Sequence, residues 1–115
     1  GTAAPKANVD FVLDNLDIRH YFQAIVHAED VDKGKPDPGV FFKVADLLGI
    51  AYGDCLVFED SPTGAKTAFN AGMKAIILTT THQEYEFEGI ASVIRCVPDY
   101  THINLLSLLE TFKQP

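Results

Sequence analysis

The sequence lacks several features that would point to particular classes of protein. Its 115 residues include no tryptophan, one methionine and only two cysteines, Cys55 and Cys96. These two cysteines form no CxxC or other metal-ligand spacing, so we interpret them as reduced thiols of a cytoplasmic protein. No apolar run approaches the ~20 residues that span a bilayer, and no secretory leader is visible. We therefore expect a soluble protein that has no membrane partner.

Basic residues are also scarce. Nine lysines and arginines face 16 acidic residues, which gives a net charge of -7. A negative field of this kind disfavours binding to nucleic acid. It does not exclude phosphorylated substrates, because a bound cation can invert the local charge. Apolar residues make up 47% of the chain, enough for one buried core, and we expect a single domain over residues 1–115.

Short apolar segments alternate with helical patterns along the chain. Predicted strands lie at 23–27, 55–58, 75–78 and 91–94, and predicted helices begin near Pro5, at Asp37-Pro38, at Ser61-Pro62 and near Ile103. Residues 55–58 are apolar throughout, which predicts a strand in the middle of a sheet covered on both faces. This alternation favours a doubly wound α/β fold with a parallel sheet. In such sheets, ligands bind beyond the carboxyl ends of the strands.

Three polar clusters occupy those predicted strand ends. Thr2 and Ala3 precede a helix start, where a hydroxyl and free backbone N–H groups could hold a phosphate. Lys35 is stiffened by the prolines around it and presents a point charge to a phosphoryl group. Glu59-Asp60 ends the apolar 55–58 segment, and a hard cation would relieve the repulsion between these carboxylates. Taken singly, each cluster also fits a plain cap or a solvated loop, but their joint order favours a phosphate and metal site.

Three segments carry a resemblance to a known family. Thr2-Ala3-Ala4, Gly34-Lys35-Pro36-Asp37-Pro38 and Phe58-Glu59-Asp60-Ser61-Pro62-Thr63-Gly64-Ala65 resemble motifs of the haloacid dehalogenase superfamily. Within it, the segments are most similar to the β-phosphoglucomutase-like branch of phosphatases and mutases. The resemblance implies that Thr2 and Lys35 are catalytic and bind the transferring phosphoryl group, and that Glu59 and Asp60 hold Mg²⁺. It also implies that Asn8, with Lys6, helps to hold the phosphate of a substrate such as a sugar phosphate.

The family's first motif, an Asp-x-Asp pair that supplies the nucleophile from a central strand, has no counterpart here. Asp30-Val31-Asp32 has the right letters, but no apolar strand ends in it and no Gly-Thr follows. The family's cap domain is absent as well. We therefore expect the C-terminal part of a core domain, inactive by itself, whose missing segment belongs to the same polypeptide or to a swapped partner chain.

Three alternatives stay open on the sequence. A metal-independent dehalogenase of the same fold would have little use for the acid pair at 59–60. A receiver-type signalling module uses similar groups, but its acids come early in the chain and its lysine comes last. A degenerate, non-catalytic domain of this fold would bind ligands without turning them over.

Overall fold

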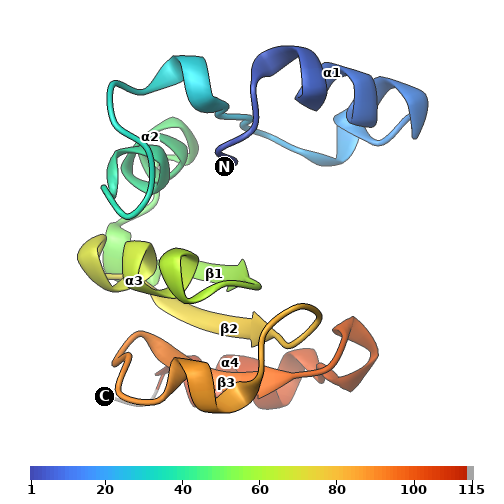
Figure 1. Ribbon diagram of the computed structural model, residues 1–115. Helices are drawn as coiled ribbons and strands as arrows, with labels where there is room; N and C mark the ends of the chain where they lie inside the picture. Colours follow the sequence, from blue (N-terminus) through green and yellow to red (C-terminus); the bar gives the residue numbers. More distant parts are fainter. Residues whose placement is uncertain (114–115) are drawn as a thin grey trace.

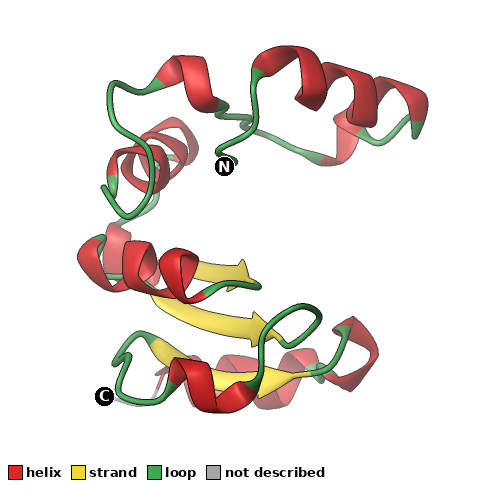
Figure 2. Ribbon diagram, viewed as in Figure 1, coloured by secondary structure: helices red, strands yellow, loops and turns green. Residues whose placement is uncertain are grey.

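The computed structural model describes residues 1–113 and has an α/β architecture with a parallel sheet. The sheet has three strands in the order β1-β2-β3, formed by Leu56–Glu59, Lys74–Leu78 and Val93–Val97. Four α-helices lie at Lys6–Asn15 (α1), Gly39–Leu48 (α2), Pro62–Asn70 (α3) and Leu105–Lys113 (α4). Figures 1 and 2 show α1 and α2 at one end of the molecule and the sheet at the other.

The fold class predicted from the sequence is confirmed. β1 pairs in parallel with β2, and β2 in parallel with β3, with Val57 opposite Ala75 and Ile77 opposite Cys96. Helix α3 connects β1 to β2, as parallel pairing requires of a crossover. Short 3₁₀ turns occupy Arg19–Tyr21 (η1), Ala28–Asp30 (η2), Tyr52–Asp54 (η3), Glu84–Phe87 (η4) and Tyr100–His102 (η5).

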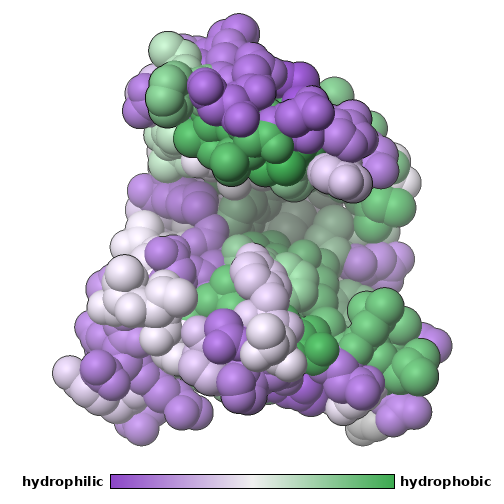
Figure 3. All heavy atoms as spheres, turned by 90° about the vertical axis from the view of Figure 1, so that its right-hand side faces the viewer, coloured by the Kyte–Doolittle hydropathy of each residue, from purple (hydrophilic) through white to green (hydrophobic). Residues whose placement is uncertain are grey.

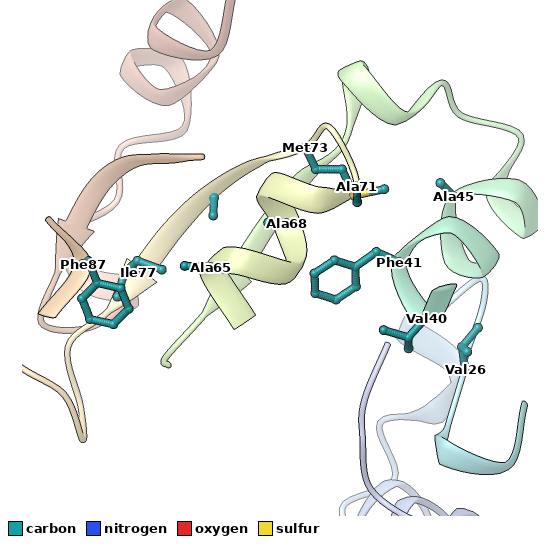
Figure 4. Packing of buried hydrophobic residues seen from close by; sticks show 11 residues of the cluster. Val26, Val40, Phe41, Ala45, Ala65, Ala68, Ala71, Met73, Ile77 and Phe87 are labelled. Atoms are coloured by element: carbon teal, nitrogen blue, oxygen red, sulfur yellow. The ribbon is translucent and has the colours of Figure 1, made fainter. Parts of the chain in front are cut away.

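The core lies on both faces of the sheet, because neighbouring residues of β2 point in opposite directions. Ile77 packs into a cluster that continues through α3 to α2, and Figure 4 shows this cluster from Phe87 and Ile77, past Ala65 and Ala68, to Phe41, Val40 and Val26. Ile76 packs on the other face with Val97 and with Leu108 of α4. Both isoleucines are fully buried, so the sheet is covered by α3 on one face and by α4 on the other.

The 55–58 strand does not lie in the middle of the sheet that residues 1–113 form. Within residues 1–113, β1 pairs with β2 alone and forms an edge of the sheet. Phe58 is 39% exposed, whereas a central strand would have both faces covered. An apolar sequence predicts that a strand should be buried, but burial also needs a neighbouring strand, and none lies beside this edge in the described part of the chain.

The predicted strand at 23–27 does not form either. This segment is extended, and Val26 accepts a hydrogen bond from the Thr2 N–H at 2.9 Å, while the Ala28 N–H donates to Ala4 at 3.0 Å. Two such bonds align the 2–4 segment with the 26–28 segment without building a strand. Helix α1 above them has no buried residue, because no sheet face lies against it among the described residues.

Helix boundaries differ from the sequence prediction by one or two residues. Pro5 is the N-cap of α1 rather than its first residue, and α2 begins at Gly39 after Pro38. The Asp37 carboxylate still serves this helix start, since it accepts the Gly39 N–H at 2.9 Å. The apolar pattern of α2 also predicts a buried Leu47, but this side chain is 60% exposed. The later predictions of a strand at 91–94 and a helix from Ile103 correspond to β3 and α4, each shifted by about two residues.

Candidate functional site

An ion pair joins the second and third sequence clusters. Lys35 lies in the loop before α2, and Glu59 is the last residue of β1. The Lys35 Nζ donates to Glu59 Oε1 at 2.5 Å, and the two side chains are only 17% and 10% exposed. The ammonium also lies 5.1 Å from the centre of the Phe41 ring. Because strand residues alternate between faces, Glu59 points to the same side as Val57, towards α3 and α2.

Gly64 makes room for the Glu59 carboxylate at the start of α3. A Cβ atom at position 64 would lie 2.0 Å from Glu59 Oε2 and 2.2 Å from its Cδ, so any residue larger than glycine would displace the carboxylate. The N-terminus of α3 is capped by Ser61, whose Oγ accepts the Gly64 N–H at 3.1 Å. The small residues Ser61 and Gly64 indicate room for a ligand near this helix start, and the structure shows that the Glu59 carboxylate fills the space at Gly64.

Thr2 and Lys35 share one small cavity. It has a volume of about 150 Å³ and is lined by Thr2, Ala3, Ala28, Val31, Asp32, Gly34, Lys35 and Val40. The Thr2 Oγ1 accepts the Ala4 N–H at 3.1 Å, which leaves the hydroxyl proton available to a ligand oxygen. Thr2, Lys35 and Ala3 therefore line a space large enough for a phosphoryl group.

Asp60 differs from its neighbour Glu59. It is exposed, and no ion pair is found for it among residues 1–113. The same residues contain no group of three or more His, Cys, Asp or Glu side chains that could hold a metal ion by themselves. Magnesium does not need three protein ligands, since it binds through one or two carboxylates together with waters and substrate phosphate. Glu59 and Asp60 fit this partial role, with Asp60 as the carboxylate that no lysine occupies.

Asn8 and Lys6 do not join this cavity. Asn8 is exposed on α1 and is absent from the cavity lining. The Lys6 ammonium pairs with Asp10 at 2.5 Å, and its backbone N–H donates to Glu29 Oε2 at 2.8 Å. One N–H group at the start of α1 is thus already bonded to Glu29 and is not free to hold a phosphate. Asp30 and Asp32 follow the extended segment before Lys35 rather than a strand of the sheet.

A groove runs along the open edge of β1. It has a volume of about 370 Å³ and is lined mostly by apolar residues, including Val44 and Leu48 of α2 and Leu56 and Phe58 of β1, with Gly1 and Glu59 also at its wall. Figure 3 shows a hollow with hydrophobic walls between the part of the molecule that holds α1 and the part that holds the sheet. The groove therefore reaches the Lys35–Glu59 pair from the side of β1 that carries no strand.

Parallel strands, with a lysine, a hydroxyl and an acid pair close to the carboxyl end of β1, define an α/β domain with a polar cluster at one edge of its sheet. A family model described as haloacid dehalogenase-like hydrolase matches residues 2–78, and the chain belongs to this family of enzymes. It is 32% identical over 107 residues to the 5-amino-6-(5-phospho-D-ribitylamino)uracil phosphatase of Arabidopsis thaliana, covering 93% of the chain and 29% of that protein. It is 37% identical over 76 residues to β-phosphoglucomutase of Bacillus subtilis, covering 66% and 34%.

A solved structure supports the fold independently. The crystal structure of a haloacid dehalogenase hydrolase of family IA, variant 3, from Entamoeba histolytica superposes with a TM-score of 0.89 at 23% identity, covering 98% of this chain and 52% of that chain. The chain spans about a third of the length of the two curated relatives above.

No helix within residues 1–113 has the length and apolar character needed to cross a bilayer.

Proposed function

We propose that the protein carrying this chain catalyses magnesium-dependent phosphoryl transfer from a phosphorylated small molecule of the sugar-phosphate class. The observation that supports this most directly is that Lys35 links the cavity at Thr2 to the acid pair at the end of β1. Two of the relatives are named for a phosphatase and a phosphomutase acting on phosphorylated compounds. Both reactions transfer a phosphoryl group, and the cavity residues serve either one.

Each side chain has a distinct role in this proposal. The Lys35 ammonium neutralises negative charge on the phosphoryl oxygens, and the Thr2 hydroxyl donates to one of them. Glu59 holds Lys35 in place and, with Asp60, provides oxygen ligands for Mg²⁺. A bound magnesium ion would supply further charge neutralisation at the same oxygens. The Ala3 backbone closes the cavity, and Asn8 is the weakest member of the proposed phosphate-binding set, because it lies outside the lining.

The nucleophile forms a second part of the proposal. Lys35 and Thr2 bind a phosphoryl group but are not placed to attack it. We propose that a further β-strand, from the same polypeptide or from a partner chain, occupies the groove beside β1 and brings an attacking carboxylate to the Lys35 end. The apolar lining of the groove and the open edge of β1 support this arrangement, since unpaired strand edges seldom stay uncovered. Residues 1–115 alone are then expected to release no phosphate.

Phosphate release from a panel of sugar phosphates tests the proposal. We expect release by the protein carrying this chain to require Mg²⁺ and to fall about 10²–10³-fold in Lys35→Met, the range for losing one donor to a transition-state oxygen. Lys33→Met is the matched control, because Lys33 is an exposed lysine two residues away and should retain full activity. Release that survives a chelator would favour a metal-independent dehalogenase. Phosphate binding without any release would favour a non-catalytic binding domain.

A further inference from the structure

Glu29 connects the turn that carries Thr2 to the segment before Lys35. It lies in η2 (Ala28–Asp30), and its Oε2 accepts the N–H of Lys6, the first residue of α1, at 2.8 Å. Helix starts leave N–H groups without partners and favour a negative charge. The N-cap residue, Pro5, has no side-chain hydrogen bond to offer. The pKa of Glu29 lies below its ordinary value, mainly because the Lys6 N–H donates to the carboxylate. The backbone N–H of Glu29 and the side chain of His27 lower this pKa further. Glu29 therefore caps α1 from outside the helix.

His27 lies against this carboxylate. Its Nδ1 is 3.1 Å from Glu29 Oε2 and 3.4 Å from Asp30 Oδ2, and the side chain is only 15% exposed. This nitrogen is buried and makes no hydrogen bond of good geometry, so it supports the carboxylate by packing against it. The turn itself is fixed to α2, because the Lys43 ammonium donates to the Asp30 carbonyl oxygen at 2.8 Å. The η2 turn that carries Glu29 is thus fixed to α2 by the hydrogen bond from Lys43.

The two segments that Glu29 joins both line the proposed phosphate cavity. Thr2 and Ala3 come from one segment, and Ala28 and Val31 come from the other, on the chain that leads to Lys35. Backbone hydrogen bonds align the 2–4 and 26–28 segments. The hydrogen bond from the Lys6 N–H to the Glu29 side chain links the two segments again, just after these residues. Its carboxylate is not part of the cavity lining. This placement fits a group that fixes the position of the turn at Thr2 without touching the occupant of the cavity.

We infer that Glu29, supported by His27, is a positioning residue that holds the Thr2 hydroxyl at the distance from Lys35 at which both groups reach one phosphoryl group. This inference rests on the function proposed above. It adds a residue that lies outside the three sequence clusters and that acts through Thr2.

Binding of inorganic phosphate in the presence of Mg²⁺ tests this role, measured by calorimetry and by the amide NMR signals of Thr2 and Ala3. Glu29→Ala should weaken phosphate binding about fivefold, which corresponds to the loss of one helix cap. Glu29→Gln keeps an oxygen for the Lys6 N–H and should restore most of the affinity. Asp99→Ala is the matched control, because Asp99 also accepts a backbone N–H, from Thr101, and contacts a histidine, but lies outside the cavity lining.

The outcomes separate this inference from the proposed function. Unchanged phosphate affinity in Glu29→Ala, with binding abolished in Lys35→Met, overturns the positioning role and leaves the function standing. If the unmodified protein binds no phosphate, the proposed function fails, and amide hydrogen exchange decides the positioning role. Exchange at the Thr2 N–H must then be faster in Glu29→Ala than in Asp99→Ala, and equal rates overturn the inference.

If the Glu29→Ala variant does not fold, Glu29→Asp is tested in its place, since the shorter aspartate side chain does not reach Lys6. Unchanged affinity and Thr2 exchange in Glu29→Asp likewise overturn the inference.

Discussion

Replacing Gly64 with alanine should displace the Glu59 carboxylate and disturb the ion pair at the centre of the site. The added Cβ would lie 2.0 Å, 2.2 Å and 2.8 Å from the Oε2, Cδ and Cγ atoms of Glu59. All three separations are below any normal contact, so the side chain has to turn away from Lys35. Overpacking of this kind costs about 1–3 kcal/mol, and alanine regains about 1 kcal/mol in a helix. The net loss in unfolding free energy is therefore about 0–2 kcal/mol.

A double-mutant cycle with Lys35→Met separates the clash from the lost ion pair. When Lys35 is absent, Glu59 has no ammonium to hold, and the alanine should cost less than it does in the unmodified protein. We expect the two costs, measured by urea unfolding, to differ by about 1 kcal/mol or more, as they do for residues in contact. Gly53→Ala is the control, because no atom lies within 4 Å of its added Cβ. Equal costs for Gly64→Ala with and without Lys35 would refute the reasoning.

Three further predictions concern other parts of the molecule. Ile77→Ala removes a fully buried side chain of β2 and should cost about 2–5 kcal/mol in urea unfolding, whereas a loss below 1 kcal/mol would contradict the packing described. Hydrogen bonds from Thr101 and then from His102 hold the pKa of Asp99 at about 2, below its ordinary value of 3.8. Its stabilising contribution should therefore be complete above about pH 4 and disappear as the pH falls through about 2, and an NMR titration midpoint near 4 would count against this. Asp60→Asn should weaken Mg²⁺ binding by at least about tenfold in calorimetry, and unchanged affinity would remove Asp60 from the proposed ligands.

Local sequence signals predicted local structure well. Ser61-Pro62 marks the start of α3, and Gly49 and Gly72 both have positive φ angles, of 68° and 72°, at the ends of helices. These features depend on neighbouring residues alone, so an isolated sequence contains the information needed to predict them. The residue types of the candidate site are also visible in the sequence, and the structure brings two of these residues, Thr2 and Lys35, to one cavity.

Predictions failed where an element depends on what packs against it. Residues 23–27 have strand composition but form no strand, and Leu47 has an apolar side chain but is exposed. Burial and strand pairing are properties of contacts between distant segments, and an apolar pattern only indicates that a surface could be covered. Glu29 was overlooked for a related reason, since its partner Lys6 lies 23 residues earlier in the chain.

The sequence by itself determined where the helices begin, to within about two residues, and which polar residues follow the apolar segments, and it led to the hypothesis that these residues bind phosphate and a hard cation. Only the tertiary structure decided that Lys35 pairs with Glu59 and leaves Asp60 exposed. Adjacent carboxylates are equivalent in a sequence, but alternation along β1 turns Glu59 towards α3, where Gly64 leaves space for it. The direction of one side chain, set by the sheet, thus separates the carboxylate that holds the lysine from the one that stays exposed.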